Sequence, residues 1–252
     1  MRGSMPEKIA FHTAVRIRDM KNLKRTRLAY KQTNITVLAD IDAKCATEEL
    51  IKNYGLLEAY IQKNPVFLTT YEPLPIDTDA PKIAKNMQDA ANKAGVGPMA
   101  AVAGAFSDLV GEFLLKNGAS DVIVENGGDI YLKITEPRTV GIYAGPSKLS
   151  DRLAFKIKPE DTPLGICTSS DSVGPSISLG TSDASTVLAD SSALADAAAS
   201  AIGNAVKGTN AMQKAIDRAK KLECVRGILV IKGEEIGAWG KLPSLIKTPN
   251  TK

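Results

Sequence analysis

One predicted helix, residues 192–206, carries polar side chains that could hold a metal ion. The helix is almost wholly apolar and small, and beyond its first turn its polar residues are Asp196, Ser200 and Asn204. Their spacing of four places them in one narrow stripe. Carboxylate, hydroxyl and amide oxygens are ligands that Mg²⁺ or Ca²⁺ prefers, with water or a phosphate completing the shell. The alternative is an alanine-rich helix whose stripe only faces solvent.

A second stretch, residues 167–180, is rich in hydroxyl groups, because six of its fourteen side chains are Ser or Thr. It begins with Cys167, Thr168, Ser169 and Ser170, at the expected end of a strand. Hydroxyls and free backbone N–H groups can hold a phosphate or the polar edge of a ring, although a flexible polar loop has the same composition. Cys167 would be a buried structural residue, or a reactive thiol if its pKa were lowered.

Residues 124–132, with the sequence VENGGDIYL, predict a tight turn between two strands. Asn126-Gly127 is typical of a type I′ hairpin, because both turn residues need a positive φ. Gly128 and Asp129 would widen the turn and leave a surface without bulky side chains. Small residues also gather at 95–105, at the start of a predicted helix, where N–H groups could bind an anion or the helix could pack closely.

Composition disfavours several classes of site. His12 is the only histidine, so a Ser/His/Asp triad and a histidine-rich metal site are not expected. The 32 basic and 28 acidic residues give a net charge of +4, and the basic segment 16–31 has few aromatics, which favours a solvated strand face over a nucleic-acid surface. Three cysteines without CxxC spacing favour a reducing compartment.

The location and domain organisation can also be predicted. Residues 1–4, Met-Arg-Gly-Ser, resemble an expression-vector remnant, and no signal peptide follows them. The longest mostly apolar stretch, 95–110, is too short to cross a bilayer. We therefore expect residues 5–252 to form one cytoplasmic domain. A small-molecule ligand is the expected partner, nucleic acid and membrane are not, and a homo-oligomer is left open.

The elements that would position these residues fall into separate blocks of strands and helices. Strands are predicted at 9–17, 27–39, 121–125, 130–134, 140–144, 153–157, 165–168, 185–189, 227–231 and 235–239. Helices are predicted at 45–63, 80–94, 98–116, 192–206 and 210–222. The order strands, helices, strands occurs twice, so the pattern favours an α+β fold over alternating βαβ units.

Four of these segments together resemble the ApbE superfamily, whose best-known members are Mg²⁺-dependent FAD:protein FMN transferases. They are the small-residue helix 98–116, the turn at 126–130, the Thr-Ser-Ser segment 168–170 and the helical stretch 194–200. The chain is most similar to a short prokaryotic branch of the superfamily, over most of residues 9–207. The resemblance implies an α+β, T-fold-related single domain of antiparallel sheet with helix pairs, in two similar halves with a nucleotide-type cleft between them.

The resemblance also implies a role for each matching residue. The implied site lines the cleft with Asn126, Gly127, Gly128 and Asp129, contacts FAD or FMN through Thr168, Ser169 and Ser170, and binds Mg²⁺ through Asp196 and Ser200. One segment departs from the family. The transferases carry a His-His-Ile-Ile-Asp-Pro-type sequence after the Thr-Ser element, with a histidine tied to transfer, whereas residues 174–180 contain neither His nor Asp.

Three functions are compatible with these features. The first is an ApbE-like protein that binds a small phosphate-bearing or flavin-type nucleotide with Mg²⁺, without ordinary FMN transfer. The second is a divergent FAD:protein FMN transferase, in which Mg²⁺ on Asp196 polarises the FAD pyrophosphate. The third is a sulfur-handling protein, because the resemblance links the short branch to sulfide assimilation toward homocysteine. Cys167 would then be a catalytic residue that carries sulfur as a persulfide.

Overall fold

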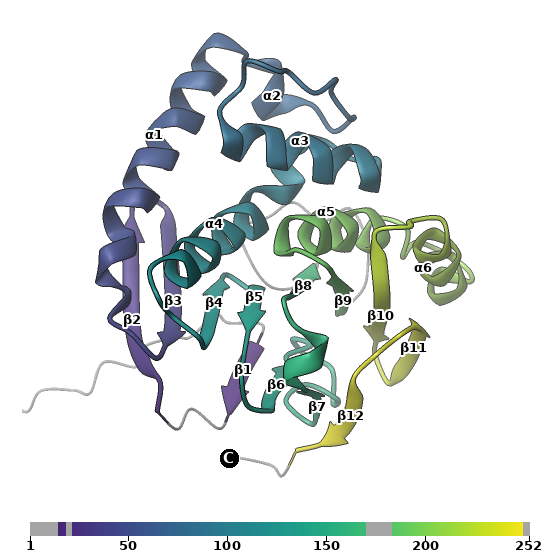
Figure 1. The fold of residues 1–252 in the computed structure, drawn as a ribbon. Coiled ribbons are helices and arrows are strands. Elements are labelled where there is room, and N and C mark those ends of the chain that lie inside the picture. Colours follow the sequence, from purple (N-terminus) through teal and green to yellow (C-terminus); the bar gives the residue numbers. More distant parts are fainter. Residues whose placement is uncertain (1–14, 19–21, 170–182, 249–252) are drawn as a thin grey trace, which may run out of the picture.

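The protein has three layers, with helices on one face of a large sheet and a small sheet on the other (Figure 1). The structure is a computed structural model that describes residues 15–18, 22–169 and 183–248. One apolar core lies between the helices and the large sheet, and a second lies between the two sheets. The large sheet is therefore buried on both faces.

All the strand pairs formed by the described residues are antiparallel. The large sheet has eight strands in the order β11-β10-β9-β8-β5-β4-β3-β2. Their bounds are β2 Lys24–Tyr30, β3 Thr33–Ala39, β4 Val122–Asn126, β5 Asp129–Lys133, β8 Leu164–Ser169, β9 Ala184–Ala189, β10 Val225–Lys232 and β11 Glu235–Gly240. The small sheet has the order β1-β6-β7-β12, with bounds β1 Val15–Arg18, β6 Arg138–Ile142, β7 Leu153–Ile157 and β12 Ser244–Lys247.

The large sheet consists of two halves with the same topology. In the first half a strand pair, β2 and β3, leads through helices to a second pair, β4 and β5. In the second half β8 and β9 lead through helices to β10 and β11. The halves join where β5 pairs with β8, at the centre of the sheet. The predicted α+β fold with two similar halves is confirmed.

The helices cover the large sheet on one side (Figure 1). Their bounds are α1 Ala46–Lys63, α2 Val66–Thr69, α3 Lys82–Ala94, α4 Val102–Lys116, α5 Ser192–Gly203 and α6 Ala211–Lys220, with short 3₁₀ turns η1 Ala43–Cys45, η2 Pro98–Ala101 and η3 Pro159–Asp161. Their ends follow local rules. The side chain of Ser191 accepts a hydrogen bond from Leu194 N (3.2 Å) and caps α5, and Gly95 ends α3 with a φ of 70°.

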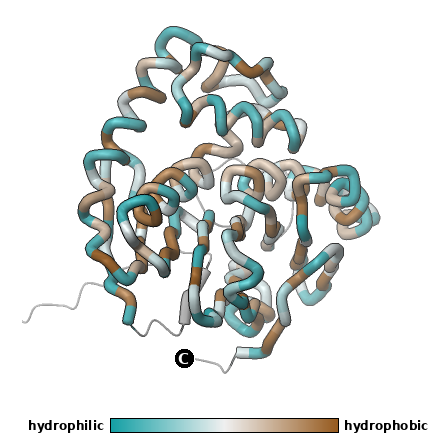
Figure 2. The backbone as a smooth tube through the Cα atoms, viewed as in Figure 1, coloured by the Kyte–Doolittle hydropathy of each residue, from teal (hydrophilic) through white to brown (hydrophobic). Residues whose placement is uncertain are grey.

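Strand residues alternate between the two cores. In β4, Val122 and Val124 face the helices, whereas Ile123 faces the small sheet. Because both faces are covered, the central strands carry apolar residues on both faces, together with a few buried polar residues such as Glu125 and Thr186. Figure 2 shows hydrophobic residues along the inner helices α4 and α5 and in the sheet. The outer helices α1, α3 and α6 carry more hydrophilic residues.

In three places an element was predicted wrongly or not at all. Residues 27–39 form two strands rather than one, because the chain turns at Lys31, which has a φ of 49°. No glycine or proline marks that turn, so periodicity alone suggested one long strand. The short helix α2 and the edge strand β12 were not predicted. Each has four residues, which is too short for a periodic signal.

The helical stretch Pro98–Lys116 is long and apolar enough, by length and composition, to cross a membrane. It extends beyond the predicted apolar stretch 95–110. However, 56% of its apolar window is buried, since α4 packs against α1, α5 and the strands β4 and β5. A core helix has the same composition, so this stretch is weak support for a membrane span.

Candidate functional site

The glycine turn predicted at 126–129 forms the tip of the β4–β5 hairpin. Asn126 pairs with Asp129, so Gly127 and Gly128 are the two turn residues, with φ values of 68° and 107°. These values agree with a type I′ turn. The predicted turn type agrees, but the predicted position, Asn126-Gly127, was one residue too early. A side chain at Gly127 would meet no atom within 4 Å, so this tip is open.

Asp129 and Cys167 are direct neighbours across the β5–β8 pair. Their side chains lie on the helix-facing side of the sheet, together with that of Ser169, because alternate strand residues share a face. Thr168 points to the opposite face, where its hydroxyl lies 3.0 Å from that of Thr186. The structure therefore brings Ser169 toward the hairpin residues and places Thr168 away from them. Ser170, His12 and residues 174–180 lie outside the described residues.

The beginning of α4 holds the hairpin in place. The Asn126 side-chain amide donates to the Ala103 carbonyl (3.1 Å), and the Ser107 hydroxyl donates to the backbone carbonyl of Asp129 (2.9 Å). The next backbone N–H, that of Gly104, donates to Oδ2 of Asp196 (3.0 Å), and the N–H of Ala103 adds a second hydrogen bond to this carboxylate. One peptide segment thus contacts both the hairpin and α5.

The predicted metal ligands Asp196 and Ser200 lie one turn apart on α5. Both are half-buried, whereas Ala197, Ala198 and Ala199 between them are buried. The start of α4 was predicted to bind an anion or to pack closely. In the structure its N–H groups already receive a protein anion, the Asp196 carboxylate. The dipole of α4 favours this negative charge.

Asp129, Cys167 and Asp196 form a cluster whose side chains all have raised pKa values. Burial raises the pKa of Asp129 to about 7, against the opposing effect of its hydrogen bond with Cys167. Burial and the nearby Asp129 raise the pKa of Asp196 well above its usual range. Burial also raises the pKa of the Cys167 thiol, and Asp129 and Asp196 add to the effect. This environment stabilises the neutral thiol, not the thiolate that a persulfide carrier needs. The catalytic role of Cys167 stays a prediction.

Two residues that the sequence analysis did not single out connect the parts of this cluster. Asp108 on α4 is 6% exposed and binds the first turn of α5, at Ser192. Burial raises the pKa of Asp108 to about 6, although hydrogen bonds from Ala193 and Ser192 oppose the rise. The sequence did contain a signal for Asp108, because it is a charged residue inside the otherwise mostly apolar stretch 102–111. Ser192 had no such signal, because a serine at a helix start is common.

The oxygen donors at this site fit Mg²⁺ only in part. Asp129 and Asp196 supply two carboxylates and Ser200 a hydroxyl, which are the hard ligands that Mg²⁺ takes. Among the described residues, no group of three or more His, Cys, Asp or Glu side chains is arranged to hold a metal ion. Mg²⁺ is commonly bound by one or two carboxylates together with water and the phosphates of a substrate. The donor set therefore suits a metal that binds with a phosphate-bearing ligand.

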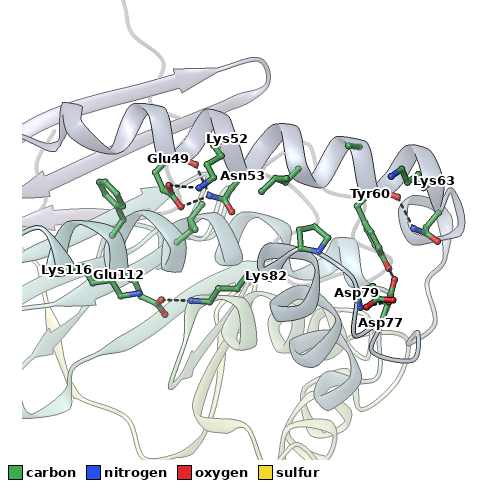
Figure 3. A pocket seen from close by; sticks show the side chains of 16 residues that line it. Glu49, Lys52, Asn53, Tyr60, Lys63, Asp77, Asp79, Lys82, Glu112 and Lys116 are labelled. Carbon is green, nitrogen blue, oxygen red and sulfur yellow. Dashed lines mark hydrogen bonds and ion pairs between the residues drawn. The ribbon is translucent and has the colours of Figure 1, made fainter.

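One groove in the described part of the chain lies away from this cluster. It has a volume of about 890 Å³ and runs between α1, the start of α3 and the second half of α4 (Figure 3). Its charged residues include pairs such as Lys82–Glu112 (3.5 Å), and the Tyr60 hydroxyl donates to Asp77 (3.0 Å). Of the predicted site residues that the structure describes, none lines this groove. We therefore place the candidate site at the hairpin and α5.

The raised pKa of Asp129 predicts a pH-dependent stability. Below about pH 4 this group is protonated in both the folded and the unfolded protein. As the pH rises toward 7, the unfolded state loses the proton first, so the contribution of Asp129 to stability falls and stays low above pH 7. We expect Asp129→Asn to raise the free energy of unfolding at pH 8 by about 1–3 kcal/mol, after allowance for solvent screening.

Thermal unfolding of wild type and Asp129→Asn between pH 4 and pH 8 measures this effect. The two melting curves should converge at low pH and separate as the pH rises. A difference in Tm that is the same across this range would contradict the raised pKa, because the asparagine side chain does not titrate.

Sequence comparison finds close relatives. The family described as "AbpE bacteria" matches residues 16–225. A UPF0280 protein of Methanococcus maripaludis is 46% identical over 228 residues, covering 88% of this chain and 92% of that protein. A UPF0280 protein of Methanocaldococcus jannaschii is 44% identical over 232 residues, covering 89% of this chain and 93% of that protein.

Two solved structures are similar in fold. The apo form of the flavinyl transferase ApbE of Pseudomonas stutzeri has a TM-score of 0.52 at 14% sequence identity, covering 86% of this chain and 93% of that chain. The flavin transferase ApbE of Vibrio cholerae has a TM-score of 0.51 at 14% identity, covering 88% and 98%. At this identity the similarity extends to the fold alone.

Proposed function

The chain belongs to the AbpE bacteria family and is an ApbE-like protein, and from this premise we propose that it binds a flavin-type nucleotide together with Mg²⁺. FAD and FMN are the preferred candidates, because the similar solved structures are flavin transferases. Binding would occur without ordinary FMN transfer. The chain contains one histidine, His12, and none in the segment where the transferases carry theirs.

The pair of carboxylates Asp129 and Asp196 carries this proposal. The charge of Asp129 raises the pKa of Asp196, and a bound cation would relieve the repulsion between the two carboxylates. Asp196 is held by backbone N–H groups at the start of α4, so it is oriented before any ligand arrives. Gly127 at the hairpin tip is exposed and has no side chain, so a flat ring system could lie against its backbone.

Five residues of the candidate site would then bind the metal ion or the flavin ring. Asp196, Asp129 and the hydroxyl of Ser200 would hold Mg²⁺, which would neutralise the charge of the phosphate of FMN or the diphosphate of FAD. The hairpin residues Asn126 and Gly127 would line the ring. Asn126 is already oriented, because its amide donates to the Ala103 carbonyl.

A thermal-shift experiment tests the proposal. FAD, FMN, ADP and ATP are each added with and without Mg²⁺, and the Tm is compared with that of the protein alone. A ligand present at a hundred times its Kd stabilises the folded state by about 2.7 kcal/mol. We expect the largest shift for a flavin nucleotide with Mg²⁺ and a smaller one for Mg²⁺ alone, because the protein supplies too few donors by itself.

Two matched variants sharpen this result. Asp196→Asn keeps the shape of the side chain but removes its charge, and it should abolish the Mg²⁺-linked part of the shift. Asp217→Asn makes the same change on the exposed face of α6, where the side chain is 53% exposed, and should leave the shift intact. If no nucleotide raises the Tm in the presence of Mg²⁺, the proposal is wrong.

Product analysis separates binding from transfer. A transferase splits FAD at its diphosphate and releases AMP, whereas a binding protein leaves FAD intact. Chromatography of FAD after incubation with the protein, Mg²⁺ and a Ser/Thr-containing acceptor peptide should show no AMP above the level in the protein-free control. Steady AMP release that depends on Asp196 would instead favour the divergent transferase.

A further inference from the structure

Asp108 on α4 is a buried carboxylate whose two oxygens both accept hydrogen bonds from the backbone of α5. Its Oδ1 accepts a hydrogen bond from the backbone N–H of Ser192 (2.7 Å), and its Oδ2 accepts one from that of Ala193 (2.9 Å). Both oxygens of this α4 side chain therefore bind the first turn of α5. Such N–H groups have no partner inside their own helix.

A hydrogen bond from α4 to α5 complements those that Asp108 accepts from α5. Asp196 on α5 accepts the N–H of Gly104 at the beginning of α4 (3.0 Å). Each of the two helices thus supplies a carboxylate that accepts backbone N–H groups at the start of the other helix. Ser192 and Asp196 are four residues apart, so the N–H that Asp108 holds lies one helical turn before the predicted metal ligand.

Ser192 extends this connection to the sheet. Its hydroxyl donates to the carbonyl of Ile130 (2.7 Å), the residue after Asp129, and its own carbonyl accepts the thiol of Cys167 (3.3 Å). A displacement of Ser192 would therefore change the position of Asp196 relative to Asp129. These two carboxylates are the pair on which Mg²⁺ binding depends in the proposed function.

We propose that Asp108 is the positioning residue of this site: through Ser192 and Ala193 it sets the place of Asp196 relative to Asp129, without touching the ligand. The metal-binding part of this inference rests on the proposed function. The structural part does not, because the distance between the two carboxylates is a property of the protein alone.

Asp108→Asn tests the inference, because one oxygen acceptor becomes an amide that cannot accept the second N–H. The first measurement needs no ligand. Hydrogen exchange of the Gly104 amide, which is bonded to Asp196 and not to Asp108, should speed up at least tenfold in the variant. Glu112→Gln, one turn further along α4 and 46% exposed in its side chain, is the matched control and should leave this rate unchanged.

The second measurement is the Kd of FAD with Mg²⁺ at a temperature where all variants are folded. We expect Asp108→Asn to weaken binding at least tenfold and Glu112→Gln to have no effect. Unchanged Gly104 exchange, or a lower Tm with an unchanged Kd, would show that Asp108 is only structural. Faster Gly104 exchange in a protein that binds no nucleotide would uphold the positioning role and reject the proposed function. If Asp108→Asn does not fold, Asp108→Glu keeps the charge, displaces it by one methylene and is measured in the same way.

Discussion

Gly165→Ala is expected to lower the free energy of unfolding by about 3 kcal/mol or more. Gly165 lies in β8, and a Cβ atom there would stand 2.3 Å from the Ser191 carbonyl oxygen and 2.5 Å from Ser192 N. These are backbone atoms, so they cannot rotate away as a side chain would. The strand and the start of α5 would have to separate, which displaces Ser192 and with it Asp196.

Denaturant unfolding with Gly55→Ala as the control measures this effect. Gly55 is exposed in the middle of α1, and a Cβ there meets no atom within 4 Å. The same chemical change should therefore stabilise the protein by about 0.5–1 kcal/mol, since alanine is the better helix former. Opposite signs at the two positions are the expected outcome. A loss below about 1 kcal/mol for Gly165→Ala would show that β8 and α5 are not held together as closely as the structure indicates.

Phe155→Ala is the second substitution with a large expected effect, a loss of about 3–5 kcal/mol. Phe155 in β7 is fully buried in the core between the two sheets. Truncation leaves a cavity that the surrounding strands can fill only in part. Because most domains are stable by about 5–15 kcal/mol, this single change would remove a large share of the total.

The control for Phe155→Ala is Leu245→Ala. Leu245 pairs with Phe155 across the β7–β12 ladder but is 43% exposed, so we expect a loss below about 1 kcal/mol. The core that holds Phe155 lies on the face of the large sheet opposite the candidate site. The nucleotide-dependent Tm shift should therefore persist in folded Phe155→Ala. Equal losses for the two variants would contradict the assignment of a second core.

The candidate site could be predicted in part from the sequence. The glycine turn with Asp129, the hydroxyl segment after Cys167 and the polar stripe with Asp196 each depend on a local pattern of residue types. The positions of Asp108 and Ser192 depend on contacts between residues more than 80 positions apart, which no local pattern contains. Thr168 was predicted to contact the ligand together with Ser169 and Ser170, yet strand alternation turns it to the opposite face of the sheet from Ser169.

The sequence by itself determined most of the longer elements, because helix and strand formation depends on the periodicity of apolar residues and on end signals such as Ser191 and Gly95. The helix predicted at 45–63 and the strand at 153–157 agree with α1 and β7 to within one residue. Only the tertiary structure decided that β5 pairs with β8, and that α4 and α5 each bind a carboxylate of the other helix. Many pairings of the same strands satisfy the local patterns, and burial of both faces of the sheet selects one of them. That selection brings Asp129, Cys167 and Asp196 together.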